Sequence, residues 1–368
     1  MKVIFCGGGT AGHVNPALAA ADYFKKQEDC EIYFSGAKGG IEEKLVGRAG
    51  YRLFAFPLAG LSRSLSLSGL RQNIRAGQNA LSAVREAGKI LREIQPDVVI
   101  GTGGYASYPM VAAAQKQGIK TALLEVNATP GVALRRLSHR ADCVMLGFEE
   151  TAALIKAKKT VLTGSPVREE IVRCRDTAYA PIFAEKRPMI LSFWGSVGAL
   201  YMNKKMVDFV ARTAAEGEFN LLHAAGASNY KWMPDEIRQK GCDLDAAKNV
   251  DLREYIFAMD KAMAQADLVI CRAGASTLAE LCCAGLPSII VPSPYVTGNH
   301  QEKNARLLER AGAAVVITEA ECTGNRLYET AQALLRDPDR LKTMGECALK
   351  RARPDALKRI YDAVKSIL

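Results

Sequence analysis

Short apolar segments alternate with longer amphipathic segments along this chain, and each half begins in the same order. An apolar segment comes first, then a glycine-rich turn, then a helical pattern. In the first half Val3–Cys6 precedes the turn GGGTAGHVNP at 7–16; in the second, Met189–Phe193 precedes WGSVGA at 194–199. This alternation is typical of parallel sheets covered by helices. The sequence therefore predicts an α/β protein with two Rossmann-like, parallel-sheet domains that face a cleft.

The length of 368 residues agrees with two domains. We expect a first domain at 1–165, a linker at 166–187 where the sequence is charged and rich in Pro and Ala, and a second domain at 188–353. The last segment, 354–368, is expected to be a helix that packs back on the first domain. Asn15 as N-cap and Pro16 as first helical residue predict that the first helix runs over Pro16–Lys26.

Apolar segments predict the strands, and amphipathic segments predict the other helices. Strands are expected at Val3–Cys6, Ile32–Ser35, Leu53–Phe56, Val98–Gly101, Thr121–Glu125, Cys143–Leu146, Val161–Thr163, Met189–Phe193, Asn220–His223, Leu268–Cys271, Ser288–Val291 and Ala314–Thr318. Helices are expected at Leu70–Ile94, at Tyr108–Gln117 and from about Leu200.

The formal charge of +10 favours anionic partners such as phosphorylated ligands or an acidic membrane surface. Nucleic acid is disfavoured because no Lys/Arg run is interleaved with aromatic residues. The ten cysteines form no C-x-x-C pair, which favours reduced thiols in the cytosol. No apolar run is long enough to span a bilayer, so any membrane contact is expected to be peripheral. The leucines and arginines of 58–75 suit either an anionic headgroup layer or an ordinary amphipathic surface.

The opening turn has the glycine spacing G-x-G-x-x-G at Gly7, Gly9 and Gly12. That spacing occurs in dinucleotide-binding turns, which also need an acidic residue at the end of the second strand. Here the second strand ends in IYFSGAKGG, with no acidic residue at its carboxyl end. This argues against a nicotinamide-dependent oxidoreductase. An anion at the start of the following helix is still favoured, and a turn without a ligand is the alternative.

Two features of the first half suggest catalysis at this edge of the sheet. His13 is a candidate general base for a sugar hydroxyl, although a histidine in this position is also often a structural hydrogen-bonding residue. A second glycine-rich turn, GTGGYASYP at 101–109, follows the strand predicted at Val98–Gly101. Two such turns on adjacent strands can hold a diphosphate, and plain turns are the alternative.

In the second half, CRAGASTLAELCCAGLP at 271–287 joins a strand to a helix that is expected to begin near Ser276. Glu280 lies three residues after Thr277 and fits a capping box. The functional alternative is a diphosphate at the helix start, with Glu280 on the ribose hydroxyls. The loop at 292–305 offers polar side chains for sugar hydroxyls, namely His300, Gln301 and Asn304.

No metal site is expected. The histidines lie far apart in the sequence, and the two D-x-D pairs, Asp243/Asp245 and Asp337/Asp339, do not follow a buried strand next to a glycine turn.

Taken together, these motifs resemble those of the MurG-type peptidoglycan glycosyltransferases. The matching segments in order are GGGTAGHVNPALA, GTGGYASYP, LEVN…PG, TGSPVR, GSVGA, CRAGASTLAE, LPSIIVPSPYVTGNHQEKNA and a late PDA. The resemblance spans nearly the whole chain. It implies the GT-B fold, with the sugar nucleotide held mainly by the second domain.

The resemblance also implies roles for individual residues. Catalysis is expected from His13, with Glu125 as the alternative base. Donor contacts are expected from Thr10, Ala11, Gly12, Asn127, Arg168, Ser196, Ile256, Ala275, Ser276, Thr277, Leu278, Ala279, Glu280 and Gln301. Contacts with the acceptor diphosphate are expected from Gly9, Gly103, Gly104 and Tyr105.

The sequence departs from the family pattern at five positions near these motifs: Ala11, Leu124, Val126, Ser165 and Trp194. Ala11 adds a Cβ to the opening turn, and Leu124 and Val126 replace two polar side chains. These departures leave the identity of the acceptor more open than the fold.

The activity implied is inverting, metal-independent transfer of N-acetylglucosamine from UDP-N-acetylglucosamine to the 4-hydroxyl of undecaprenyl-diphospho-N-acetylmuramoyl-pentapeptide. No cofactor is required. The expected partners are these two substrates and the anionic inner face of the cell membrane, where the protein would be peripheral on the cytoplasmic side. Two alternatives stay open: a GT-B paralogue with another lipid acceptor, and a non-catalytic protein that binds UDP-sugars.

Overall fold

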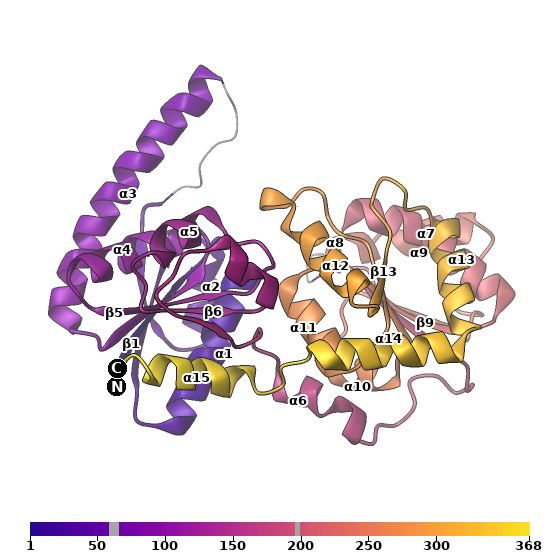
Figure 1. Cartoon of the computed structure of the whole chain (residues 1–368). Helices are drawn as coiled ribbons and strands as arrows, with labels where there is room; N and C mark the ends of the chain where they lie inside the picture. Colours follow the sequence, from indigo (N-terminus) through magenta and orange to yellow (C-terminus); the bar gives the residue numbers. More distant parts are fainter. Residues whose placement is uncertain (59–65, 196–198) are drawn as a thin grey trace. The chain divides into compact units, whose positions relative to one another are not determined.

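The computed structural model describes residues 1–58, 66–195 and 199–368; the side chains of 67–76 are also outside the description. The chain divides into two compact units (Figure 1). Unit 1 comprises Met1–Pro166 together with Asp355–Leu368, and unit 2 comprises Val167–Pro354. Each unit is built on one parallel sheet, so the α/β prediction with two Rossmann-like domains is confirmed.

The sheet of unit 1 has seven strands in the order β3-β2-β1-β4-β5-β6-β7, and all neighbouring strands are parallel. Central strands of such a sheet are buried on both faces and therefore read as continuous apolar runs. The strands are β1 (Lys2–Gly7), β2 (Glu31–Ala37), β3 (Arg52–Phe56), β4 (Val98–Gly103), β5 (Lys120–Glu125), β6 (Cys143–Leu146) and β7 (Thr160–Leu162).

The helices of unit 1 are those that connect consecutive strands of its parallel sheet, together with the C-terminal helix. They are α1 (Ala11–Gln27), α2 (Ile41–Arg48), α3 (Leu67–Ile94), η1 (Tyr105–Ser107), α4 (Tyr108–Lys116), α5 (Val132–Ser138), η2 (Glu149–Leu154) and α15 (Ala356–Lys365). One core cluster joins α3 and α4 to the sheet through residues that include Leu91, Val99 and Met110.

Helix α1 begins five residues earlier than the sequence predicted, because Thr10 and not Asn15 is its N-cap. Pro16 therefore lies inside the helix rather than at its first position. As the sixth residue of the helix, Pro16 lies beyond the N–H groups that a helix start leaves free, so α1 lacks the bond that this position would donate to the Gly12 carbonyl. The consequence is functional: Ala11, Gly12 and His13 belong to the first turn of α1.

The C-terminal helix α15 packs on α1 within unit 1. The ring of Tyr361 lies edge-on to Phe24, with 5.1 Å between the ring centroids, and its hydroxyl donates to Glu28 at 2.9 Å. Lys365 forms an ion pair with the same glutamate at 3.1 Å. These contacts explain why the last residues of the chain belong to the unit formed by the first.

The sheet of unit 2 has six parallel strands in the order β10-β9-β8-β11-β12-β13. They are β8 (Met189–Phe193), β9 (Asn220–Ala224), β10 (Val250–Arg253), β11 (Leu268–Cys271), β12 (Ser288–Ile290) and β13 (Ala314–Val316). The pattern of apolar segments did not predict the edge strand β10. It is only partly buried and carries Asp251 and Arg253, so it lacks the apolar run of a central strand.

The helices of unit 2 lie over the same sheet (Figure 1). They are α6 (Glu169–Val172), η3 (Cys174–Asp176), α7 (Leu200–Glu216), α8 (Ala227–Tyr230), α9 (Met233–Gln239), α10 (Met259–Gln265), α11 (Ala275–Cys283), η4 (Thr297–Asn299), α12 (His300–Arg310), α13 (Gly324–Leu335) and α14 (Pro338–Arg351).

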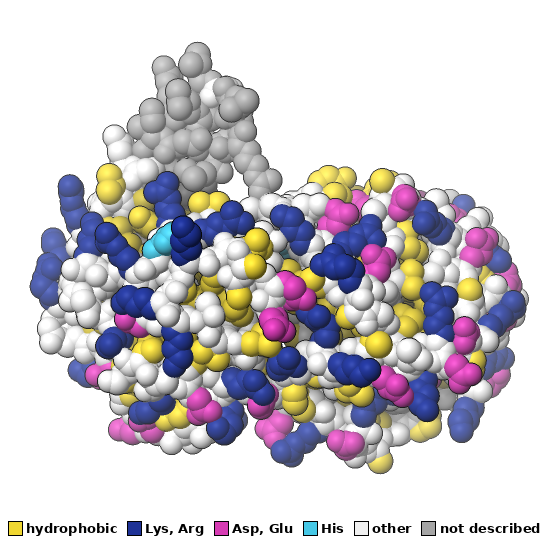
Figure 2. Space-filling model, viewed as in Figure 1, with side chains coloured by type: hydrophobic (Ala, Val, Ile, Leu, Met, Phe, Trp, Pro, Cys, Tyr) yellow, Lys and Arg dark blue, Asp and Glu magenta, His cyan; other side chains and the backbone are white. Residues whose placement is uncertain are grey.

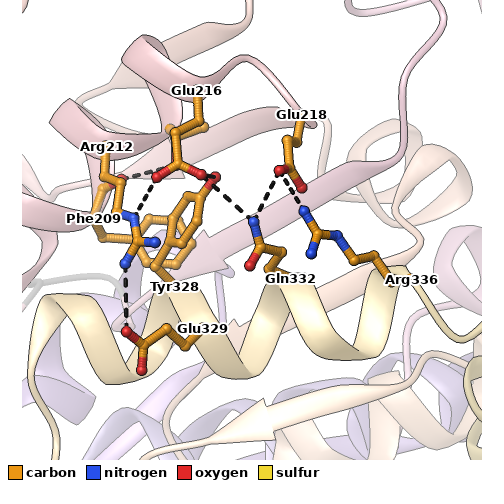
Figure 3. A network of polar contacts seen from close by, with 9 residues as sticks. Phe209, Arg212, Glu216, Glu218, Tyr328, Glu329, Gln332 and Arg336 are labelled. Atoms are coloured by element: carbon orange, nitrogen blue, oxygen red, sulfur yellow. Dashed lines mark hydrogen bonds and ion pairs between the residues drawn. The ribbon is translucent and has the colours of Figure 1, made fainter.

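Helices α7 and α13 are joined by a polar network above a buried aromatic core (Figure 3). Tyr328 is fully buried, and its hydroxyl donates to Glu216 at 2.9 Å. The guanidinium of Arg212 lies 4.2 Å from the centroid of the Tyr328 ring and also bonds Glu216. The network therefore satisfies the buried phenol and fixes the position of α13 on α7.

His223 on β9 is fully buried between two side chains. Its Nε2 lies 3.0 Å from the amide oxygen of Asn203, which can only accept, so Nε2 carries the hydrogen. Its Nδ1 lies 3.1 Å from the Ser192 hydroxyl. Burial lowers the pKa of His223 to about 4 from the ordinary 6.5, since the charged imidazolium is poorly solvated there.

We expect His223 to make the stability of unit 2 depend on pH in acid. Below pH 6.5 the unfolded chain binds a proton at this residue and the folded chain does not, until the pH reaches about 4. The free energy of unfolding should therefore fall by up to about 3 kcal/mol as the pH falls through this window. His223→Gln keeps a donor and an acceptor but does not titrate, so urea unfolding between pH 7 and 4 should show a shallower decline. His300→Asn, at a partly exposed histidine of α12, is the control. Equal slopes for wild type and His223→Gln would contradict the assignment.

Candidate active site

Each sheet reverses its strand order once, and the predicted site residues of each unit gather at that point. In unit 1 the reversal lies between β1 and β4, and the two glycine-rich turns follow these strands. In unit 2 it lies between β8 and β11, where the WGSVGA turn and the CRAGAST segment begin. Ligands of open parallel sheets bind outside the carboxyl ends of the strands at such a switch point. The topology thus gives each unit one candidate site.

His13 is held by the opening turn of unit 1 and is partly exposed. Its Nδ1 lies 3.1 Å from the carbonyl oxygen of Gly8 and 3.1 Å from the hydroxyl of Thr10. A carbonyl only accepts, so the bond with Gly8 requires a hydrogen on Nδ1 and leaves the lone pair on Nε2 in the neutral ring. The Nε2 atom is thereby suited to receive a proton from a sugar hydroxyl.

The second glycine-rich turn packs against this imidazole. A Cβ on Gly103 would lie 2.7 Å from His13 Cδ2, and a Cβ on Gly104 would lie 2.2 Å from the Gly8 carbonyl oxygen. Both glycines also have positive φ, +107° and +74°. Only glycine meets both requirements, so Gly103 and Gly104 allow the two turns to approach each other.

The N–H of Gly9 is already engaged within the chain. It donates to the Glu42 carboxyl at 3.1 Å. An acceptor diphosphate would have to displace this carboxyl to reach that N–H, and so would a dinucleotide. The ring of Tyr105 lies against the same glycine, 3.1 Å from the position of a Cβ. Burial, and secondarily the charge of Glu42, raises the pKa of Tyr105, so its phenol stays a hydrogen-bond donor near neutral pH.

Glu125, the alternative base, is buried at the end of β5. One carboxyl oxygen accepts from the N–H of Asn127 at 3.0 Å and from its side-chain amide at 3.2 Å; the other accepts from the N–H of Gly131 at 3.0 Å. Burial raises its pKa, and the bonds from Asn127 and Gly131 oppose that effect. The contacts make Glu125 the organiser of the loop at 126–131, which also carries the predicted donor contact Asn127.

Unit 2 has a cavity of about 440 Å³ at its switch point. The cavity lies at the ends of β8, β11, β12 and β13 and includes the start of α7. Its walls combine aromatic and polar side chains, among them Trp194, Tyr201, Tyr295, Arg272, Glu319 and Gln301. This composition, a largely apolar concavity with a few convergent polar groups, is typical of a small-molecule site.

Glu280 on α11 faces Arg168 and not the start of its own helix. The Arg168 guanidinium lies 3.3 Å from a Glu280 carboxyl oxygen, and the side chain of Glu280 is 18% exposed. Burial raises the pKa of Glu280, with Arg168 opposing the shift. The capping-box alternative is wrong because Gly274, not Thr277, is the N-cap of α11 and no side chain caps the helix. The carboxylate is thus paired with Arg168 in this structure.

The remaining predicted residues of unit 2 differ in burial: one lines the cavity and three are buried. Gln301 lines the cavity, and its side-chain oxygen accepts from the N–H of Ser293 at 2.8 Å. Leu278 and Ile256 are buried, and the N–H of Leu278 donates to the carbonyl of Gly274 at 3.0 Å. Asn304 is fully buried and donates to the carbonyl of Ala273, which makes its predicted contact with sugar hydroxyls wrong.

Ser196, a predicted donor contact, lies outside the described residues. So does most of the leucine- and arginine-rich segment at 58–75, which the sequence offered as a possible membrane surface. The other residues of the α11 start, Ala275, Ser276, Thr277 and Ala279, form the first turns of that helix as their position predicts.

At four of the five positions that depart from the family pattern, the side chain is buried. Leu124, Val126, Ser165 and Trp194 are each less than one tenth exposed. Leu124 and Val126 are apolar, so the two polar groups lost from the pattern are replaced by core packing. Trp194 contributes to a core cluster and to the cavity wall of unit 2. Ala11 is the first residue of α1 and is partly exposed.

In the part of the chain that the structure describes, no group of three His, Cys, Asp or Glu side chains is arranged to hold a metal. Of the D-x-D pairs, Asp337 caps α14 by accepting from the N–H of Arg340, and Asp243 accepts from the N–H of Asp245. Within the same part of the chain, no helix combines the length and the apolar composition that a membrane crossing needs.

Comparisons with known proteins agree with this geometry. The model of the glycosyltransferase family 28 N-terminal domain matches residues 3–146, and that of the C-terminal domain matches residues 189–360. Both relatives described here carry the name UDP-N-acetylglucosamine--N-acetylmuramyl-(pentapeptide) pyrophosphoryl-undecaprenol N-acetylglucosamine transferase. The protein from Acetivibrio thermocellus is 42% identical over 100% of this chain and 98% of its own length. That from Listeria monocytogenes is 39% identical over 100% of each.

Among solved structures, the crystal structure of Acinetobacter baumannii MurG aligns with a TM-score of 0.80. The alignment has 26% identity and covers 99% of each chain. Similarity over the whole length, with a family model matched in each half of the chain, confirms the resemblance identified from the sequence. The chain therefore belongs to glycosyltransferase family 28, among the UDP-N-acetylglucosamine-dependent transferases that carry the muramyl-pentapeptide name.

Proposed function

We propose that this protein transfers N-acetylglucosamine from UDP-N-acetylglucosamine to the 4-hydroxyl of undecaprenyl-diphospho-N-acetylmuramoyl-pentapeptide. The full-length similarity to transferases with that printed activity is the observation that carries the proposal. The reaction is proposed to be inverting and independent of a metal, with the acceptor oxygen attacking the anomeric carbon as UDP leaves.

Unit 2 is proposed to hold the donor. The start of α11 presents unpaired backbone N–H groups, and a diphosphate there is favoured by the helix dipole. Arg168 lies beside this helix and would stabilise the charge that grows on the leaving diphosphate. Glu280 would accept hydrogen bonds from the ribose hydroxyls, and Gln301 at the cavity wall would bind the sugar.

Unit 1 is proposed to hold the acceptor, with His13 as the general base. The Gly8 carbonyl supports the required tautomer, because its bond with Nδ1 leaves Nε2 to take the proton of the 4-hydroxyl. Gly103, Gly104 and Tyr105 form the neighbouring turn that would contact the acceptor diphosphate.

An acceptor assay tests the activity. The purified protein is incubated with radiolabelled UDP-N-acetylglucosamine and the lipid-linked muramoyl-pentapeptide, and the expected result is a labelled disaccharide lipid. Product with another lipid acceptor only would favour a paralogue with altered specificity. Binding of UDP without turnover on any lipid acceptor would favour a non-catalytic protein. Both outcomes contradict the proposal.

The protein is also proposed to work at the anionic cytoplasmic face of the cell membrane. Unit 1 carries a groove of about 620 Å³ between α4 and α5 that is lined by Lys116, Arg135, Arg136, His139 and Arg140. Figure 2 shows Lys and Arg side chains gathered over this part of the unit. Nearby elements expose large apolar side chains, Leu81 at 64% and Val132 at 69%. Cationic and apolar groups together suit the headgroup layer of an acidic bilayer.

Charge reversal in this groove should release the protein from membranes. Each basic residue near an acidic bilayer contributes about 1 kcal/mol, so the combined variant Arg135→Glu, Arg136→Glu and Arg140→Glu should lower partitioning about 100-fold or more. Sedimentation with vesicles of phosphatidylglycerol and phosphatidylethanolamine measures this. The control reverses three exposed cations of α14, Arg340, Lys342 and Lys350. Equal sedimentation of the two variants would contradict the assignment of this surface.

A further inference from the structure

A glutamate that the proposed mechanism does not use lies beneath the opening turn of unit 1. Glu42 is in the first turn of α2 and is fully buried. Among the described residues, its carboxyl group is held by hydrogen bonds from backbone N–H groups and not by an ion pair. Burial of a carboxyl group is costly unless its oxygens are hydrogen-bonded, so its contacts need an explanation.

The backbone of two strand ends supplies those contacts. One carboxyl oxygen accepts from the N–H of Ala37, at the end of β2, at 2.7 Å. The other accepts from the N–H of Gly9, in the turn after β1, at 3.1 Å. Both oxygens act as acceptors, and the two bonds join the ends of β1 and β2 through one side chain.

Three glycines make room for this side chain. A Cβ on Gly8 would lie 2.0 Å from Glu42 Oε1, one on Gly36 would lie 2.5 Å from Cγ, and one on Gly40 would lie 2.5 Å from Cδ. These distances are far below van der Waals contact, so each position must lack a side chain for the carboxyl group to fit. One of these glycines lies in the opening turn and two lie at or just after the end of β2, so the turn packs against a carboxyl group of the protein itself.

The held turn leads directly to His13. Gly8 and Gly9 are the residues whose positions Glu42 fixes, and the Gly8 carbonyl is the acceptor for Nδ1 of His13 at 3.1 Å. If the turn moves, this carbonyl moves with it, and the imidazole loses the bond that selects its tautomer. A displacement of about 1 Å at a catalytic group can lower a rate about 100-fold.

We propose that Glu42 is a positioning residue for His13: its carboxyl group occupies the glycine turn, sets the Gly8 carbonyl and so fixes the orientation and tautomer of the imidazole. The inference rests on the proposed function of His13 as general base. Under this proposal the opening turn binds the Glu42 carboxyl group of the protein itself. The acceptor diphosphate then binds at the neighbouring turn, residues 101–109.

Glu42→Gln is the sharpest test because it keeps size and shape. A glutamine has one acceptor oxygen, so its NH₂ group must face the N–H of either Gly9 or Ala37 and one bond is lost. We expect kcat with the lipid acceptor to fall about 10- to 100-fold, with KM for UDP-N-acetylglucosamine within about threefold of wild type. Glu43→Gln removes a carboxylate from the same helical turn at an exposed position and is the matched control.

The second readout is the tautomer of His13, measured by ¹⁵N NMR of histidine-labelled protein without substrate. The wild type should show hydrogen on Nδ1 of His13, and Glu42→Gln should show a mixture of tautomers. Gly36→Ala disturbs the same contact without changing Glu42, since the added Cβ would displace the Glu42 side chain. It should reproduce both effects, and it serves if Glu42→Gln does not fold, as thermal unfolding would reveal.

The outcomes separate the inference from the proposed function. If the wild type makes no product with the lipid acceptor, the proposed function fails, and the NMR measurement still tests the link between Glu42 and His13. An unchanged His13 tautomer in both folded variants would overturn the inference. So would a kcat equal to that of Glu43→Gln, or a loss confined to KM for the sugar nucleotide.

Discussion

His13→Ala is expected to lower kcat for transfer to the lipid acceptor about 10³-fold, with little change in the affinity for UDP. A positioned general base contributes about 10²- to 10⁴-fold to a rate, and the donor contacts proposed for unit 2 do not involve this residue. The Nδ1 bond to the Gly8 carbonyl is the structural reason to expect Nε2 as the base. Steady-state kinetics with saturating UDP-N-acetylglucosamine, combined with calorimetric UDP binding, measures both quantities.

The control for this experiment is Asn15→Ala, at an exposed residue of the same helix α1. It should retain wild-type turnover, since its side chain points to solvent. Wild-type turnover in His13→Ala would remove the histidine from the mechanism. In that case Glu125→Gln becomes the decisive variant, although the three hydrogen bonds to the Glu125 carboxyl predict that it mainly disturbs the loop that carries Asn127.

Glu280→Ala is expected to weaken binding of UDP-N-acetylglucosamine about 100-fold. A hydrogen bond to a charged group contributes about 1.5–3 kcal/mol, and a ribose with two vicinal hydroxyls can make two such bonds to one carboxylate. The loss should appear in Kd and in KM for the donor, whereas kcat at saturating donor should change less. Removal of the carboxylate also leaves Arg168 without its 3.3 Å partner, close to the proposed diphosphate position.

Glu170→Ala separates these two effects. Glu170 lies 3.8 Å from the same guanidinium, and its side chain is 54% exposed. If loss of a carboxylate beside Arg168 were enough to weaken the donor, both variants would do so. We expect Glu170→Ala to bind UDP-N-acetylglucosamine like the wild type. Comparison with 2′-deoxy-UDP-sugar adds a direct check: the wild type should discriminate against it, and Glu280→Ala should not.

The sequence predicted most of the fold because the signals for it are local. Cys143–Leu146, Met189–Phe193 and Leu268–Cys271 are strands with the predicted bounds, since a strand buried on both faces is a nearly continuous run of apolar residues. The edge strand β10 was missed for the same reason, because it is half exposed and reads as polar.

Signals for helix starts were less reliable, since several residue types satisfy them at once. Asn15–Pro16 is a good start signal, yet α1 begins at Ala11 because the turn after β1 places Thr10 in the N-cap conformation. Thr277 and Glu280 fit a capping box. In the structure, however, Glu280 accepts a hydrogen bond from Arg168, which lies 112 positions away in the sequence. In both cases a contact set by the tertiary structure decided between two locally acceptable arrangements.

The sequence by itself determined two parallel-sheet halves and the glycine turns at their switch points, because apolar periodicity and glycine spacing are properties of neighbouring residues. Only the tertiary structure decided what those turns hold. The opening turn surrounds the carboxyl group of Glu42, 33 residues from Gly9, and directs the Gly8 carbonyl to His13. No spacing rule reports such a contact, because it depends on how α2 packs beneath the ends of β1 and β2. The acidic group at this turn is thus a buried side chain from the next helix, bonded to the backbone and not to a ribose.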